Sequence, residues 1–232
     1  MHQLTKSLHV LAVGLWFGMA VFFSFPVALS LFDTFERVTE PGQRPAWFPP
    51  SLLYSGDPAN WTSPPAGIDK PIFKSARDVQ KEQGSRAAGA AVSPMFSWYF
   101  GMQLGCAAVA LLTALRLLSA EPKAKVHKAR LIVLIFANLL MLAGLGLERK
   151  VSELRGPRNN ATDALLIAAP NIPEDIYNEA ADARKAFGMW HGISTTLNLG
   201  TIILVSIAMA LAAQLPAGSR PQAAQQAGED KL

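Results

Sequence analysis

Four long stretches of apolar residues divide the chain, and nearly all of its charged residues lie between them. A helix needs roughly 20 apolar residues to cross the hydrocarbon core of a bilayer, and it satisfies its own backbone hydrogen bonds there. The pattern therefore predicts four transmembrane helices, although the third stretch is short enough to fit a buried helix of a soluble protein. The predicted spans are at about residues 8–32, 95–117, 129–147 and 187–215.

These spans predict an all-α fold, a four-helix transmembrane bundle that forms a single membrane domain over residues 1–215. The first span also has features of a signal peptide, with Lys6 before it and the small-residue sequence Ala28-Leu29-Ser30 near its end. Its apolar region is longer than a usual signal core, so we keep it as a span. The segment that follows it lies on the same side of the membrane in both interpretations.

The short segment between the second and third spans is strongly basic. Residues 117–130 hold four Lys or Arg residues and one acid, and short basic loops stay in the cytoplasm. Both ends of the chain are then cytoplasmic, and the two long extramembrane loops, at about 33–94 and 148–186, lie on the same outer side. We expect a multi-pass protein of a bacterial inner membrane.

Proline and tryptophan are concentrated in the first outer loop, in an insertion at about residues 40–85. Proline fixes φ and removes a hydrogen-bond donor, so little of this stretch is expected to be helical. Its tryptophans either dock on another membrane-protein subunit or dip into the lipid interface, and the sequence leaves both interpretations open. The polar tail at 216–232, rich in Ala, Gln, Gly and Pro, is predicted to be disordered in the cytoplasm.

The composition is that of a chain solvated partly by lipid. Charged residues make up 16% of it, below the quarter found in soluble domains, and the net charge of +4 gives no basic face for nucleic acid. Cys106 is the single cysteine, so the chain has no internal disulfide and no cysteine-rich zinc site. With no Ser/His/Asp set, phosphate loop or paired carboxylates, the sequence predicts no enzyme, no catalytic residue, no metal and no cofactor.

A polar stripe marks the outer half of the fourth span. His191, Ser194 and Asn198 follow i, i+3, i+7 spacing and share one helix face. Gln103 in the second span and Asn138 in the third are their natural partners. Polar side chains at membrane depth point into the bundle or toward a cavity, so the stripe is either a ladder of interhelical hydrogen bonds or the wall of a solute path.

Two histidines, His9 and His191, are candidate ligands for a metal or haem. Each lies near the N-terminal end of its span, and the first and fourth spans must run antiparallel. The two side chains are then separated by most of the roughly 30 Å hydrocarbon core, so they cannot share one metal. A cofactor held by a single histidine stays open, beside the simpler interpretation of a hydrogen-bonded residue at a helix end.

Pairs of glycines four residues apart occur in three of the four spans. Such pairs let helices approach closely in lipid, where association depends on packing. They predict either a compact bundle or a face that contacts another subunit. The pairs are Gly14/Gly18, Gly101/Gly105 and Gly188/Gly192.

Three segments carry a resemblance to a known family. The stretch 8–18, followed by Val21-Phe22-Phe23, resembles the first span of the transmembrane-protein-205-like family. Arg86-Ala87-Ala88-Gly89, with Pro94-Met95-Phe96 and Tyr99, resembles its lead into span two, and 187–192, with Ser194 and Leu197-Asn198-Leu199, resembles its last span. The resemblance implies a small four-helix membrane protein, whose bacterial relatives are known mostly as a domain of unknown function. The 40–85 insertion departs from the family, so no partner or activity is carried over.

The sequence thus favours a non-enzymatic membrane protein, in contact with the lipid bilayer, that acts as a structural or accessory subunit of a membrane complex through its outer loops. The alternative is a carrier or channel for a small or hydrophobic solute, which would use the polar face of the fourth span. A cavity beside that face would distinguish the alternative, because a dry hydrogen-bond ladder needs none.

Overall fold

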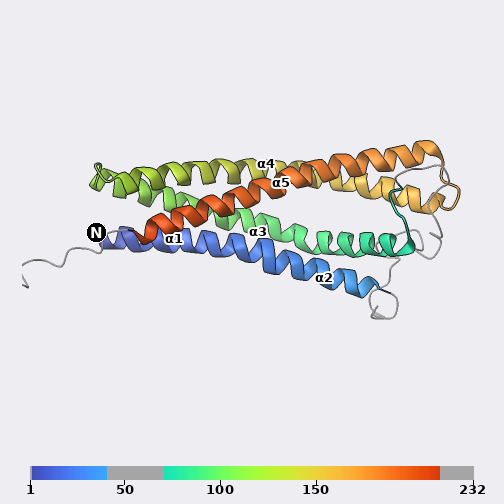
Figure 1. Ribbon diagram of the computed structural model, residues 1–232, viewed down its shortest axis with the longest axis horizontal. Helices are drawn as coiled ribbons and strands as arrows, with labels where there is room; N and C mark the ends of the chain where they lie inside the picture. Colours follow the sequence, from blue (N-terminus) through green and yellow to red (C-terminus); the bar gives the residue numbers. More distant parts are fainter. Residues whose placement is uncertain (1, 41–70, 215–232) are drawn as a thin grey trace, which may run out of the picture.

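The structure is a computed structural model that describes residues 2–40 and 71–214. Four helical rods run side by side in it (Figure 1). All four are long and apolar enough to cross a membrane, so the predicted all-α bundle with four spans is confirmed. The first rod consists of α1 (His2–Phe22), a π-helical turn η1 (Phe23–Val27) and α2 (Ala28–Thr39); the others are α3 (Ala76–Ala120), α4 (Lys125–Ala168) and α5 (Glu174–Ala213).

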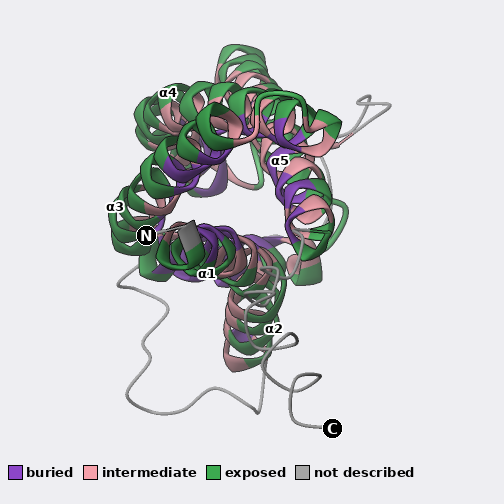
Figure 2. Ribbon diagram, turned by 90° about the vertical axis from the view of Figure 1, so that its left-hand side faces the viewer, coloured by how far each residue is buried: buried purple, intermediate pink, exposed green. Residues whose placement is uncertain are grey.

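Different segments meet at the two ends of the bundle. At the loop end, α2 and α4 finish and α3 and α5 begin; at the termini end, α1 begins, α5 finishes and a short turn joins α3 to α4 (Figure 1). The α4 and α5 helices pack on each other, α1 packs on α3, and α5 also contacts α1. Buried residues line the inner faces (Figure 2), while large apolar residues such as Leu112, Phe136 and Ile203 are exposed, which suits contact with lipid.

Local sequence signals explain where α3 and α5 begin. The side chain of Ser75 accepts a hydrogen bond from the backbone N–H of Asp78, and the Asp78 carboxylate accepts one from the backbone N–H of Ser75 at 3.1 Å, which forms a reciprocal capping box. Pro173 precedes α5, and Glu174 and Asp175 occupy its first turn, where carboxylates stabilise the positive end of the helix dipole. Both helices therefore start well before their predicted spans.

The helices extend beyond the predicted spans at the loop end, so much of both extramembrane loops is helical. The 148–186 segment is helical except around residues 169–173, and the 33–94 segment is helical at both of its ends. Charged residues mark the point where a helix leaves the lipid. The helix itself continues, because its residues still pack on neighbouring helices beyond the apolar stretch. Residues 41–70 of the 40–85 insertion and the tail at 216–232 lie outside the described residues.

Two separate apolar clusters hold the bundle together. The termini core joins α1, α3, α4 and α5 in the half nearer the chain ends, and the loop-end core joins α4, α5 and the start of α3. The termini core contains Ala12, Val13, Trp16, Ala107, Ala110, Ala114, Leu134, Ala137, Met141, Val205 and Ala208. The loop-end core contains Phe73, Val79, Ala161, Leu165, Leu166 and Ala180.

The predicted glycine pairs do not bring helices of this chain together. A Cβ added at any of their six positions would meet no atom of another described segment within 4 Å, and alanines fill the termini core in their place. The close approach occurs instead at Gly84, where an added Cβ would lie 2.8 Å from the Cα of Glu36. Gly84 therefore lets α2 pack directly on the start of α3. The six glycines, which no other described part of the chain covers, are Gly14, Gly18, Gly101, Gly105, Gly188 and Gly192.

Candidate functional site

A cavity of about 450 Å³ lies between the termini core and the loop-end core. Its walls come from η1 and α2 on one side and from α3, α4 and α5 on the others. Pockets for small molecules usually have volumes of about 300–1,000 Å³, so this central pocket has the size of a binding site.

Aromatic rings form one part of the wall. The ring of Phe23 stacks on Tyr99 with centroids 4.3 Å apart and meets the edge of Phe96 at 5.4 Å. Phe100 contacts Tyr99 edge to face at 5.3 Å. These side chains all line the central pocket, so its aromatic part offers an apolar surface built from η1 and α3.

A hydrogen-bonded bridge crosses the pocket wall beside these rings. The hydroxyl of Tyr99 donates to Oδ1 of Asn198 at 2.7 Å, and Nδ2 of Asn198 donates to Oγ of Ser24 at 2.7 Å. One amide thus ties α5 to both α3 and η1. These two hydrogen bonds hold the Asn198 amide in place, and its second N–H and second oxygen lone pair stay available at the pocket wall.

Gln103 adds a polar group to the pocket wall. Its Oε1 accepts a hydrogen bond from the indole Nε1 of Trp16 at 2.8 Å. The side chain is 1% exposed, and its Nε2 has no hydrogen-bond partner among the residues that the structure describes. This nitrogen is covered by surrounding atoms, so Gln103 holds Trp16 in place and does not offer its amide donor to an occupant.

Charged side chains form the wall nearer the loop end. Arg86, Arg155, Arg158 and Glu148 all line the central pocket. Arg86 is held by Asp163, with its Nη1 2.8 Å from the carboxylate Oδ1. Arg155 donates to Ser93 through Nη1, and its Nη2 lies 3.6 Å from Oε1 of Glu148.

Glu82, behind that wall, is a shared anchor for three arginines. It is 6% exposed and pairs with Arg86, Arg158 and Arg184. The Arg184 pair places Nη1 3.1 Å from Oε2 but without hydrogen-bond alignment. A single buried carboxylate thereby holds guanidinium groups from α3, α4 and α5 in place.

The histidine of the predicted polar stripe is part of this polar region. The ring of His191 stacks on Phe187 with centroids 5.6 Å apart, and the guanidinium of Arg158 lies 5.1 Å from the centroid of the same Phe187 ring. Arg155 and Arg158 are the charged neighbours of His191. The pocket thus combines a basic region with an aromatic one.

The predicted cluster is largely gathered at one place. His191, Ser194, Asn198 and Gln103 all line the central pocket. Asn138 does not join them, because its Nδ2 donates to the backbone oxygen of Leu134 on its own helix at 2.8 Å. A Ser, Thr or Asn side chain in a helix often makes this local bond, and sequence spacing cannot distinguish it from a contact between helices.

The pocket arginines and Glu148 were missed because they lay in predicted loops. A signal for them exists in the sequence. Gly144, Glu148, Val151, Arg155 and Arg158 are separated by alternating intervals of three and four residues, which places them on one face of a helix. A prediction that only separates charged segments from apolar ones does not detect this helical spacing.

His9 belongs to a different place in the bundle. Its Nδ1 lies 2.9 Å from Oγ1 of Thr113, in the half that holds the termini core. His127 and Arg130, also buried there, are joined by a hydrogen bond of 2.6 Å. His9 and His191 therefore do not share a site, and among the described residues no three His, Cys, Asp or Glu side chains gather as metal ligands.

The fold and the pocket define the class of protein, a four-span membrane protein with a central cavity. Residues 72–160 match the family model of a domain of unknown function, DUF4149. The match covers less than half of the chain, but it includes all of α3, most of α4 and the pocket walls that they form. The link to the transmembrane-protein-205-like family is not shown by this match. No curated protein and no solved structure matches the chain.

Proposed function

We propose that this protein binds a small hydrophobic or amphiphilic solute in its central pocket, as a membrane carrier or receptor and not as an enzyme. The observation that carries the proposal is the cavity itself, of about 450 Å³ beside the polar stripe of α5. A dry ladder of interhelical hydrogen bonds would need no such space. The aromatic part suits an apolar group, and the basic part suits a polar one.

The surface of α2 supports access from the lipid. Leu29 and Phe32 line the pocket, and they are also exposed to the surroundings. In Figure 1, α2 and α5 diverge toward the loop end. A solute dissolved in the bilayer would reach the pocket between these two helices, without crossing the polar surface of the molecule.

The lysines at one end of the bundle support an orientation of the protein in the membrane. Lys123, Lys125 and Lys128 lie in or beside the α3–α4 turn at the termini end. Short basic loops stay in the cytoplasm, so we place the termini end inside and the loop end outside. The resemblance to bacterial four-helix proteins supports a bacterial inner membrane.

A pocket-filling variant tests the proposed function. Ser194 lines the pocket, whereas Thr196, two residues further along α5, is exposed and does not. In nanodiscs of neutral lipid, Ser194→Phe should weaken binding of a neutral fluorescent solute such as Nile red by about tenfold, or about 1.4 kcal/mol, because the ring occupies the cavity. The control Thr196→Phe should bind as the wild type does. Equal affinity for both variants, with helicity unchanged by circular dichroism, would remove the proposal's basis.

A second candidate function, an accessory subunit of a membrane complex, is favoured by the open glycines. Gly101 and Gly105 lie exposed on one face of α3, and no atom of the described chain fills the space beside them. Another transmembrane helix packs closely against such a face. Purification in mild detergent with mass spectrometry tests this function, and a monomer without a co-purifying protein would contradict it.

A further inference from the structure

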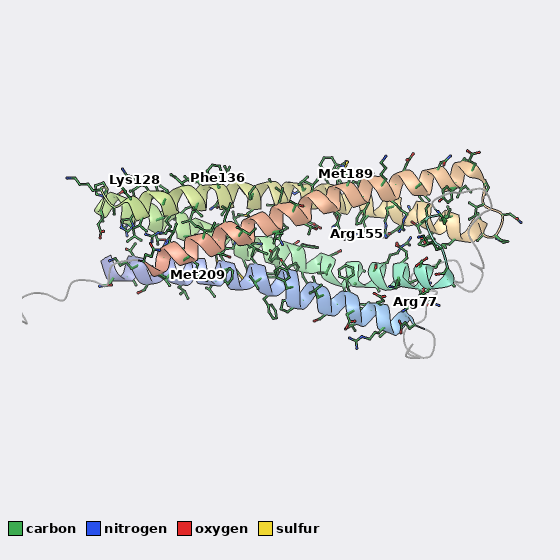
Figure 3. The ribbon with its side chains drawn as sticks, in the orientation of Figure 1. Arg77, Lys128, Phe136, Arg155, Met189 and Met209 are labelled. Carbon is green, nitrogen blue, oxygen red and sulfur yellow. The ribbon has the colours of Figure 1, made fainter. Side chains whose placement is uncertain are left out.

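The loop-end wall of the central pocket places guanidinium groups where a bound solute would present its polar end. Arg155 is the best placed of them. In the view of Figure 3 it lies between α3 and α5, in the loop-end half of the bundle. Its side chain is 25% exposed and lines the cavity.

The Arg155 guanidinium is incompletely engaged by the pocket's own carboxylate. Its Nη2 is 3.6 Å from Glu148, longer than the 2.7–3.2 Å of a hydrogen bond. Glu148 is the single carboxylate among the described residues that line the pocket, against three arginines. An acidic group entering the pocket could therefore approach Arg155 without displacing a tight ion pair.

The neighbouring groups are held in position before any ligand arrives. Arg86 is fixed by Asp163 and Glu82, and Arg158 is fixed by Glu82. The imidazole of His191 is oriented by stacking on Phe187. Because these groups are already ordered, an anion that approaches Arg155 loses less affinity to the ordering of side chains.

Building on the proposed function, we infer that the occupant is an anionic amphiphile, with a carboxylate or phosphate at Arg155 and an apolar chain against the aromatic rings. Hydrogen bonds between a guanidinium and a carboxylate or phosphate are charge-assisted and about twice as strong as neutral ones. The rings of Phe23, Phe96 and Phe100 receive the chain. A cationic amphiphile would be repelled by Arg155, and a neutral one would leave Arg155 with only its long 3.6 Å ion pair to Glu148.

A headgroup series tests the inference in nanodiscs of neutral lipid. Amphiphiles with one saturated chain and a carboxylate, a hydroxyl or a trimethylammonium group compete with bound Nile red at neutral pH. The carboxylate should compete about tenfold more strongly than the alcohol, a difference of about 1.4 kcal/mol, and the cation least. Acetate and inorganic phosphate, which lack the chain, should not compete. Competition by these small ions at the concentrations of the carboxylate would identify a free anion as the ligand and overturn the amphiphile.

A charge-matched pair of variants assigns the preference to the pocket. Arg155→Gln should abolish the advantage of the carboxylate over the alcohol while leaving the alcohol's own competition unchanged. Arg149→Gln removes the same charge from an exposed position of α4 that does not line the pocket, and it should keep the advantage. An equal response to carboxylate and alcohol in the wild type, or a preference that survives Arg155→Gln, would overturn the inference while leaving the pocket as a solute site. Failure of every amphiphile to displace Nile red would also overturn the inference, whereas Nile red binding that Ser194→Phe leaves unchanged would refute the proposed function.

Discussion

Replacing Gly84 with alanine should separate α2 from α3. The added Cβ would lie 2.8 Å from both the Cα of Glu36 and the carbonyl oxygen of Phe35, and 2.9 Å from the Glu36 nitrogen. Carbon atoms pack at about 3.5–4.0 Å, and all three of these neighbours are backbone atoms, so no rotamer change relieves the overlap. The whole of α2 must move outward, at a cost of about 1–3 kcal/mol for an overpacked contact.

The movement would disturb specific contacts between α2 and α3. Lys81 Nζ lies 3.0 Å from Oε1 of Glu36, and Oγ1 of Thr39 donates to the backbone oxygen of Gln80 at 3.2 Å. Alanine also favours a helix interior over glycine by about 1 kcal/mol, which offsets part of the cost. A control at an open glycine of the same helix separates the two effects.

Thermal unfolding in mild detergent, followed by circular dichroism, measures the outcome. Gly101→Ala gives the same helix-propensity gain, but its Cβ would meet no atom of another helix within 4 Å among the residues that the structure describes. The stability of Gly84→Ala should therefore be lower than that of Gly101→Ala by about 1–3 kcal/mol, with a lower melting temperature than the wild type. If Gly84→Ala proved as stable as Gly101→Ala, the close approach of α2 to α3 would be refuted.

Two further variants test other buried contacts by the same unfolding measurement. Thr113→Val removes the hydroxyl that bonds His9 and should cost about 1 kcal/mol, the usual contribution of one buried hydrogen bond. Thr113→Ser should restore stability, and a stable valine variant would show that the bond contributes nothing. Glu82→Gln removes the carboxylate shared by three arginines and should cost about 3–5 kcal/mol. Glu153→Gln, at a side chain 67% exposed, should change little, and equal losses for the two would contradict the role of Glu82 as an anchor.

Hydropathy predicted the four spans, since lipid imposes a length and a composition on any helix that crosses it. It could not predict where the helices end. The capping box at Ser75 and Asp78 lies well before the second predicted span, and the loop-end core around Leu165 lies well beyond the third. Both depend on contacts outside the lipid, which a measure of mean apolarity does not detect.

The site was predicted in part for a similar reason. The spacing of His191, Ser194 and Asn198 fixed a common face on one helix, and the structure places that face on the central pocket. The bridge from Tyr99 through Asn198 to Ser24 joins three segments, and its partners depend on how the helices are rotated against one another. A sequence alone carries no information on that rotation unless a second periodic pattern is recognised.

The π-helical turn at Phe23–Val27 has a consequence for how the first rod is built. There the backbone N–H of Ala28 bonds to the oxygen of Phe23, five residues back, around Pro26. A π turn holds one residue more than a regular helical turn, and each residue of an α-helix advances the chain by about 100° around the axis. The side chains after the turn are therefore rotated about the helix axis, relative to where an uninterrupted helix would place them. One rod can therefore direct Trp16 into the termini core and Phe32 toward the central pocket, from faces that an uninterrupted helix would hold at a different angle.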